Sequence, residues 1–126
     1  MEEQGTVSLW LGRAKSADAL WAALDVQFSD DGDSIGSEFS RAFGIDCYDD
    51  ALREAEFYDA PGATLAEFFR GASHESTVLS RFMARGVTVE PGTNCLVLLY
   101  DCRHSQPSTA QLTGVAFTCM GAVSYR

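Results

Sequence analysis

Residues 95–100 read Cys-Leu-Val-Leu-Leu-Tyr and are apolar at every position. A strand with one solvated face alternates apolar and polar residues, whereas an unbroken apolar run of this length is typical of a strand covered on both faces. The run therefore predicts a central strand. The rest of the chain must supply neighbouring strands and helices that cover it.

Three further stretches are predicted to be strands. Residues 6–12 alternate smaller and apolar side chains, which predicts a half-buried strand in which Trp10 covers the second face. Residues 112–125 place apolar side chains at alternate positions and predict a long strand that pairs with 95–100 as a hairpin. Residues 53–58 favour a strand, with a helix as the alternative.

Helix start and stop signals are found in the first half of the chain. Ser16 precedes a helical apolar spacing over residues 17–24, which predicts a short amphipathic helix. Further on, Asp33 or Ser34 is expected to cap a helix that ends at Gly44.

Two more helices are expected in the second half. After a turn predicted at 60–62, residues 64–67 match a capping box, and residues 76–85 carry a longer helical pattern. The elements together predict the α+β class: a small, mostly antiparallel sheet with helices packed on one face. No repeat or linker divides the chain, so residues 1–126 are expected to form one domain.

The charge is concentrated in one segment. Residues 25–59, which we call the acidic segment, contain eleven acidic and two basic residues and so carry the whole formal charge of −9. Large apolar residues are interleaved with these acids, so the segment does not have the composition of a disordered tail. A folded acidic surface is complementary to a basic protein partner. The net charge argues against a nucleic acid or an anionic membrane as ligand.

The compartment is inferred from the cysteines and from targeting signals. The sequence shows no export signal and no apolar run long enough to cross a bilayer, so a cytoplasmic protein is expected. In that compartment thiols stay reduced. The four cysteines are therefore expected to be reduced and mostly buried: Cys47, Cys95, Cys102 and Cys119.

A metal site is considered first among the enzymatic alternatives. The string Asp30-Asp31-Gly32-Asp33, with Glu38 six residues after the glycine, partly matches a calcium-binding EF-hand loop. The first and third ligand positions would then be Gln27 and Ser29, which leaves too few charged ligands. Turn formation and helix capping are the preferred interpretation, so we predict no metal and no cofactor.

A cysteine-dependent site is the second alternative. Cys102 and His104 stand two residues apart in an expected loop, but no further zinc-ligand pair and no orienting third group accompanies them. Hydrolysis by a pair of carboxylates stays formally open, because any acidic segment contains two acids. No phosphate-binding glycine loop or nucleophile elbow is present. We therefore predict a binding protein without catalytic residues rather than an enzyme.

Five strings occur in an order that resembles a known family. They are residues 7–12 (Val-Ser-Leu-Trp-Leu-Gly), 31–39 (Asp-Gly-Asp-Ser-Ile-Gly-Ser-Glu-Phe), 43–46 (Phe-Gly-Ile-Asp), 94–100 (Asn-Cys-Leu-Val-Leu-Leu-Tyr) and 121–125 (Gly-Ala-Val-Ser-Tyr). In this order they resemble the bacterial immunity protein 22 family and span nearly the whole chain.

The resemblance implies a single immunity-type domain of a polymorphic toxin system, which serves in competition between bacteria. Such a protein protects its producer by binding the toxic domain of a cognate effector, typically encoded beside it, and for such loci the usual targets are nucleases. The family offers no catalytic residues to carry over. Residues 90–93 and 103–110 look less typical of it, so contacts made there would be particular to this chain.

The charge pattern and the resemblance lead to one functional hypothesis. A nuclease site is basic because it holds a polyanion, and an inhibitor that presents carboxylates can occupy that site. The hypothesis that only an apolar patch binds, while the acids confer solubility, stays open, as does an acidic adaptor unrelated to toxins. The oligomeric state is left undetermined. The expected toxin-binding residues are the central acids of the segment: Asp30, Asp31, Asp33, Glu38, Asp46, Asp49, Asp50, Glu54 and Glu56.

Overall fold

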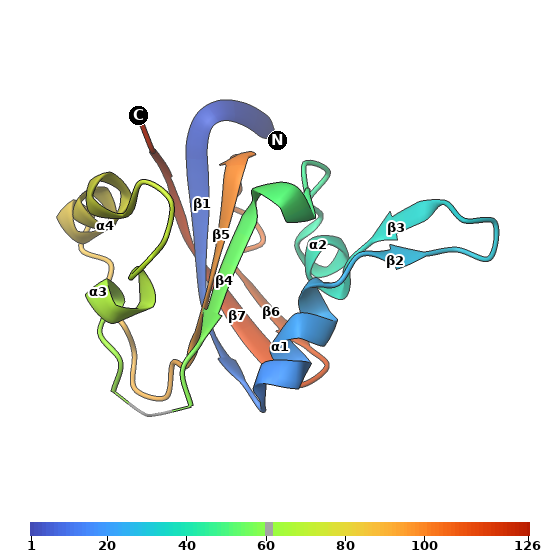
Figure 1. Cartoon of the computed structure of the whole chain (residues 1–126), viewed down its shortest axis with the longest axis horizontal. Helices are drawn as coiled ribbons and strands as arrows, with labels where there is room; N and C mark the ends of the chain where they lie inside the picture. The colour runs from blue at the N-terminus through green and yellow to red at the C-terminus, as the bar shows by residue number, and fades with distance from the viewer. Residues whose placement is uncertain (60–61) are drawn as a thin grey trace.

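The protein is built on one five-stranded antiparallel sheet (Figure 1). The computed structural model describes residues 1–59 and 62–126, and the turn expected at 60–62 falls partly outside them. The strand order is β4-β5-β1-β7-β6. The α+β class and the antiparallel sheet are confirmed. The strands are β1 (Glu2–Ala14), β4 (Arg53–Phe57), β5 (Cys95–Cys102), β6 (Thr109–Leu112) and β7 (Val115–Ser124).

Strand β1 lies at the centre of the sheet. It pairs with β5 on one side and with β7 on the other, and its residues 5–12 are all buried. The prediction of a half-buried strand over 6–12 therefore underestimated its burial, because helices cover both of its faces. Gly12 is required where β1 approaches β7, since a Cβ atom there would lie 2.6 Å from the carbonyl oxygen of Ala116.

Helices lie on both faces of the sheet and not on one face, which corrects the predicted arrangement. Helices α1 (Ala17–Leu24) and α2 (Glu38–Phe43) lie on one side of the sheet, whereas α3 (Leu65–Phe68) and α4 (Glu75–Ala84) lie on the other (Figure 1). Because β1 and β5 carry apolar side chains on both faces, both faces need cover.

A separate apolar core lies on each side of the sheet. Trp10 packs edge-on against Phe39 of α2 in the first core, with the two ring centroids 4.9 Å apart. In the second core, Leu9 packs with Phe68 and Phe82 from the opposite pair of helices. Adjacent residues of one strand, Leu9 and Trp10, thus belong to different cores, as the alternation of a strand requires.

Side-chain caps set the helix ends in the first half of the chain. The Ser16 hydroxyl accepts a hydrogen bond from the Ala19 amide, as predicted for α1. For α2 the cap is Ser37, not Asp33 or Ser34, because residues 34–36 belong to strand β3. The predicted end at Gly44 is confirmed, with a left-handed φ of 64°.

The remaining local predictions mostly hold. The capping box of α3 is present, with the Thr64 hydroxyl accepting from the Glu67 amide and the Glu67 carboxylate accepting from the Thr64 amide. Helix α4 begins one residue before the predicted range 76–85 and ends one residue before its end. A short 3-10 turn, η1 (Asp50–Leu52), leads into β4, which confirms the strand favoured for residues 53–58 over the helix alternative.

The prediction of a hairpin between residues 95–100 and 112–125 was wrong. The polar segment after β5 contains β6, which pairs with β7, and β1 lies between β5 and β7. Local alternation identifies strands but carries no information on which distant strand is the neighbour. Strand β1, the first of the chain, lies where the hairpin prediction expected β5 and β7 to pair directly.

The cysteine prediction was half right. Cys95 and Cys119 are free and buried, as expected. Cys47 and Cys102 are joined by a disulfide, with their Cα atoms 5.8 Å apart, and are therefore not reduced. The two residues are 55 positions apart in sequence. The fold brings the segment after α2 against the end of β5, a proximity that the sequence did not reveal.

A small two-stranded hairpin, β2 (Gln27–Phe28) and β3 (Ser34–Gly36), projects away from the sheet and helices (Figure 1). We call residues 27–36 the arm. Its loop is closed by the Ser29 amide, which donates to the Asp33 carbonyl at 2.8 Å. Within residues 1–59 and 62–126, no helix combines the length and the hydropathy needed to cross a membrane.

Candidate protein-binding surface

The acidic segment is not one compact patch. It begins after α1, runs out along the arm, returns through α2 and η1, and ends in the edge strand β4. Most of its predicted toxin-binding residues are exposed, and two are half-buried. The exposed ones are Asp30, Asp31, Asp33, Asp46, Asp49, Asp50 and Glu56, and the half-buried ones are Glu38 and Glu54.

Three of the candidates lie together at the tip of the arm. Asp30, Asp31 and Asp33 surround Gly32, which adopts a φ of 86° in the turn. The arm contains no basic residue. The tip therefore carries three negative charges on an element that stands clear of the sheet (Figure 1).

A second group lies between α2 and β4. Asp46 and Asp49 line a cavity of about 330 Å³, into which Leu52 also faces. The Asp46 carboxylate lies 3.6 Å from the amino group of Met1, and both groups are largely exposed. Asp49 also caps η1 by accepting from the Ala51 amide.

Two acids that sequence reasoning did not select line the same cavity. Glu2 comes from the start of β1 and Asp101 from the end of β5. Both belong to the part of the chain whose charges balance, and they are 99 positions apart in the sequence. Only the pairing of β1 with β5 brings them beside Asp46 and Asp49, so no sequence signal pointed to them.

Glu38 and Glu54 mainly stabilise the fold. The Glu38 carboxylate accepts from the amide and the hydroxyl of Thr113, at 3.0 and 2.9 Å, which ties α2 to the loop between β6 and β7. The Glu54 carboxylate accepts from the amide and the hydroxyl of Ser73 at 2.9 and 2.6 Å. Their acceptor sites are largely used within the molecule, so they are weaker candidates for partner contacts than the exposed acids.

Both basic residues of the acidic segment make internal contacts. Arg41 clamps the root of the arm, because its guanidinium donates to the Gln27 side chain at 2.6 Å and to the Ile35 carbonyl at 3.1 Å. Arg53 donates to the Leu24 carbonyl at 3.1 Å and to the Tyr48 hydroxyl at 2.9 Å. The positive charges of the segment are thus close to the body of the molecule, whereas many of its acids face solvent.

Exposed apolar side chains accompany these acids. Large hydrophobic side chains are usually buried, and an exposed group of them marks a binding site. Of the six that are exposed in the described part of the chain, three belong to the acidic segment. Phe28 and Ile35 are on the arm, with exposed fractions of 64% and 45%, and Leu52 is in η1.

The cysteine and histidine pair does not form a reactive site. Cys102 is fully buried and bonded to Cys47, so it has no thiol to ionise. His104 is also buried; its ring stacks on Trp10 and its Nε2 lies 2.8 Å from the Pro107 carbonyl oxygen. Among the residues that the structure describes, no group of three or more His, Cys, Asp and Glu side chains is placed to hold a metal ion.

The free thiols are also unsuited to nucleophilic chemistry. Burial raises the pKa of Cys95 to about 12, and burial likewise raises the pKa of Cys119. A thiol acts as a nucleophile through its thiolate, which is scarce at neutral pH when the pKa is raised.

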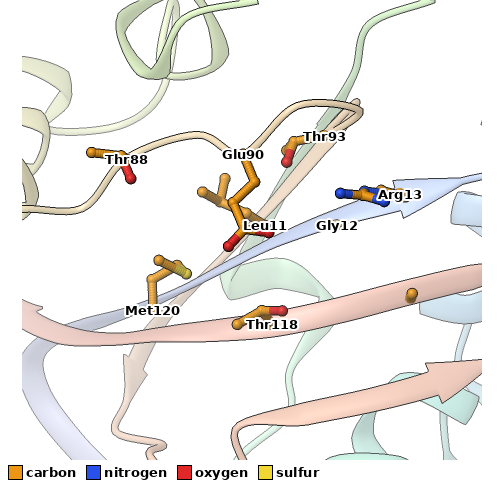
Figure 2. Close-up of a pocket in the computed structure, with 9 residues that line it drawn as sticks. Leu11, Gly12, Arg13, Thr88, Glu90, Thr93, Thr118 and Met120 are labelled. Atoms are coloured by element: carbon orange, nitrogen blue, oxygen red, sulfur yellow. The ribbon is translucent and has the colours of Figure 1, made fainter.

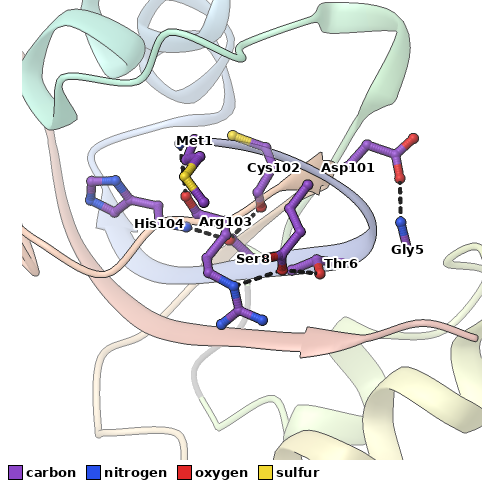
Figure 3. A network of polar contacts seen from close by, with 9 residues as sticks. Met1, Gly5, Thr6, Ser8, Asp101, Cys102, Arg103 and His104 are labelled. Carbon is purple, nitrogen blue, oxygen red and sulfur yellow. Dashed lines mark hydrogen bonds and ion pairs between the residues drawn. The ribbon is translucent and has the colours of Figure 1, made fainter.

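A polar network holds the N-terminal strand against the segment that follows β5 (Figure 3). The buried Ser8 hydroxyl donates to the Cys102 carbonyl at 2.7 Å and accepts from the His104 amide at 3.0 Å. Arg103 pairs with Glu3 at 2.7 Å, and the Thr6 hydroxyl donates to the same carboxylate. The Thr6 hydrogen bond is the main cause that lowers the pKa of Glu3. The contacts of these residues are accounted for by their role in holding the fold together.

A cavity of about 270 Å³ opens on the face of the sheet that α3 and α4 cover in part (Figure 2). Arg13 closes one side by donating to the Pro91 carbonyl at 2.7 Å. None of its lining residues belongs to the acidic segment, so it is separate from the candidate surface. The lining consists of Leu11, Gly12, Arg13, Thr88, Glu90, Thr93, Ala116, Thr118 and Met120.

The fold and the surface describe a small α+β domain that carries many exposed acids on one segment. Comparison with known families places this domain. The family model described as Immunity protein 22 matches residues 7–125, nearly the entire chain. The chain belongs to the Immunity protein 22 family, and this membership supports an immunity role. Neither a curated protein nor a solved structure matches the chain.

Proposed function

We propose that this protein binds and neutralises the toxic domain of a cognate bacterial toxin through the exposed face of its acidic segment. The protein acts as one immunity-type domain over residues 1–126, in a polymorphic toxin system that serves competition between bacteria. It acts as a stoichiometric inhibitor and not as an enzyme. The observation that carries the proposal is that the acids and half of the exposed large apolar side chains of the described residues lie on one segment.

The combination of acids and apolar side chains fits a protein interface. Typical interfaces have an apolar centre, enriched in aromatic residues, and a polar rim. Phe28, Ile35 and Leu52 supply apolar contact area, and the surrounding carboxylates supply charge. Attraction between opposite charges raises association rates about ten- to a thousandfold and falls with salt. A fast rate suits an inhibitor that must bind the toxin before the toxin reaches its substrate.

A nuclease domain is the partner whose chemistry fits best. A nuclease presents Lys and Arg to the phosphates of its substrate, and exposed carboxylates can occupy the same positions. The candidate surface offers such carboxylates at the arm tip and beside η1. We place the action in the cytoplasm, where the substrates of a nuclease are. That compartment keeps thiols reduced, so binding is best measured with and without reductant, because of the Cys47–Cys102 bond.

Co-expression with the toxin domain encoded beside this chain tests the proposal. We expect survival of the cells, copurification of the two proteins, and association that slows as salt rises. Replacing Asp46, Asp50 and Glu56 by Lys should slow association at low salt while leaving the fold intact, since all three are exposed. The control for net charge is Asp18→Lys with Glu90→Lys, two exposed acids outside the segment, compared with Asp50→Lys and Glu56→Lys. Cells that die, with no complex, would refute the proposal.

A further inference from the structure

The arm differs from the rest of the acidic segment in its apolar content. Phe28 lies on β2 and Ile35 on β3, and their exposed fractions of 64% and 45% are unusual for such side chains. Neither residue belongs to the core on either side of the sheet. The fold therefore does not account for these two side chains.

The arm is held in place at its root. Arg41 of α2 donates to the Gln27 side chain and to the carbonyl oxygens of Ile35 and Gly36, so both strands are fixed to one helix. Helix α2 is itself fixed by Phe39 and Phe43, which are buried against Trp10. An isolated two-stranded hairpin is at best marginally stable in water. This clamp gives the arm a defined direction.

A projection that is ordered before binding favours a higher affinity. A segment that is already ordered loses less conformational entropy when it meets its partner. Aromatic side chains that insert into a pocket carry a large share of the energy of an interface. The arm presents one aromatic and one branched apolar side chain below an acidic tip. In Figure 1 its ribbon projects away from the sheet and the helices.

The charge of the arm defines the occupant that it fits. Asp30, Asp31 and Asp33 give the tip three negative charges, and no basic residue within the arm offsets them. A second copy of this chain, with its net charge of −9, would repel such a tip. The complement is a concave surface with a basic lining and an apolar pocket.

We infer that the arm is the element that enters the active-site cleft of the toxin domain: Phe28 and Ile35 anchor it and the three tip acids steer it. This inference rests on the proposed function and narrows it from the whole segment to residues 27–36. The body acids beside η1 and on β4 then act from the rim. The two roles separate kinetically, because steering changes the association rate and buried anchors change the dissociation rate.

Three sets of variants test the inference by binding kinetics with the cognate toxin domain. Phe28→Ser with Ile35→Ser should raise the dissociation rate about ten- to a hundredfold, as expected for truncated anchors. Asp30→Asn, Asp31→Asn and Asp33→Asn should slow association at low salt with little effect on dissociation. The charge-matched control is Asp46→Asn, Asp50→Asn and Glu56→Gln, which should slow association less.

A shortened arm tests the same inference without introducing serine at positions 28 and 35. Gln27 and Gly36 are paired across the hairpin, so residues 28–35 can be replaced by Asn-Gly, which favours a two-residue turn. The melting temperature should stay close to that of the unaltered protein, because the arm lies outside both cores. Rescue of cells that express the toxin should be lost.

The outcomes distinguish this inference from the proposed function. If the unaltered protein neither binds nor protects, the proposed function fails, and the inference fails with it. If the unaltered protein binds and the arm variants bind equally well, the function stands and the arm is not the inserted element. An arm-dependent dimer in sedimentation, with unchanged toxin binding, would also overturn the inference in favour of a second copy.

Discussion

At the residue scale, Asp101 shows how one side chain ties distant parts of the chain together. It is the penultimate residue of β5 and has a φ of 58°, and its carboxylate accepts from the Gly5 amide at 3.0 Å and from the Tyr125 hydroxyl at 2.6 Å. The Tyr125 hydrogen bond, followed by that of Gly5, lowers the pKa of Asp101 below its ordinary value of 3.8. A carboxylate with a lowered pKa in the folded state stabilises the fold above the ordinary pKa.

This linkage predicts an effect of pH on the free energy of unfolding. Asp101 contributes its full stabilisation above about pH 4, and the contribution is lost as pH falls through the lowered folded-state pKa. Asp101→Asn keeps an acceptor oxygen and tolerates the left-handed backbone. With this variant, the free energy of unfolding should fall less steeply as the pH is lowered from 7 to 2. Urea unfolding over this pH range measures the difference.

The matched control is Asp18→Asn, an exposed acid in the first turn of α1. Its acid limb should stay close to that of the unaltered protein. Equal limbs for Asp101→Asn and the unaltered protein would contradict the role assigned to the Asp101 carboxylate. A loss of stability that is equal at every pH from 2 to 7 would indicate lost packing and not a lost charge.

At the element scale, the start of α2 decides where the arm ends. Ser37 is fully buried and shares a reciprocal pair of hydrogen bonds with Ser40: the Ser40 amide donates to the Ser37 hydroxyl at 2.9 Å, and the Ser37 amide donates to the Ser40 hydroxyl at 2.8 Å. Ser37→Ala should lower the free energy of unfolding by about 0.5–2 kcal/mol, because it removes the cap. Chemical denaturation measures the difference.

Ser34→Ala is the control, because Ser34 is exposed on β3 and was one of the caps predicted from sequence. It should leave the free energy of unfolding nearly unchanged. If Ser34→Ala destabilised the protein as much as Ser37→Ala, the helix would begin where the sequence pattern placed it. The two variants therefore decide between the observed and the predicted start.

The sequence pattern misplaced the start of α2 because local capping signals alone do not decide it. Ser16, Gly44 and the Thr64–Glu67 box act within one helical turn, and the structure confirms all three. The sequence before Phe39 offers several capping residues in a row, and tertiary contacts select among them. Arg41 holds residues 35 and 36 in the hairpin, which leaves Ser37 as the first residue free to begin the helix.

The candidate surface, like the helix ends, could be predicted only where neighbouring residues in the sequence define it. The acidic excess of residues 25–59 is visible in the sequence, and most of the selected acids are exposed. The exposure of Phe28 and Ile35 was not predictable, because apolar residues within a folded segment are normally assigned to the core. Glu2 and Asp101 join Asp46 only through the pairing of β1 with β5, a contact between the two ends of the chain.

At the scale of the whole molecule, the position of β1 links the two ends of the chain. The first strand can complete its pairing only after both its neighbours, β5 and β7, have been synthesised, since they lie in the last third of the chain. Pairings between residues far apart in sequence fold slowly and cooperatively. The three central strands should therefore open only when the whole domain unfolds, whereas the arm belongs to neither core.

Hydrogen exchange measures this difference directly. In the free protein, the amides of β1, β5 and β7 should exchange with the free energy of global unfolding, and those of the arm should exchange through local opening at a much lower free energy. On addition of the toxin domain, protection should appear in residues 27–36 and not in the residues around the cavity beside Arg13. Protection at that cavity, with an arm that exchanges as in the free protein, would move the interface to the opposite face of the sheet. Equal protection of the arm and the central strands in the free protein would mean that the arm is part of the cooperative core, because only global unfolding would then expose its amides.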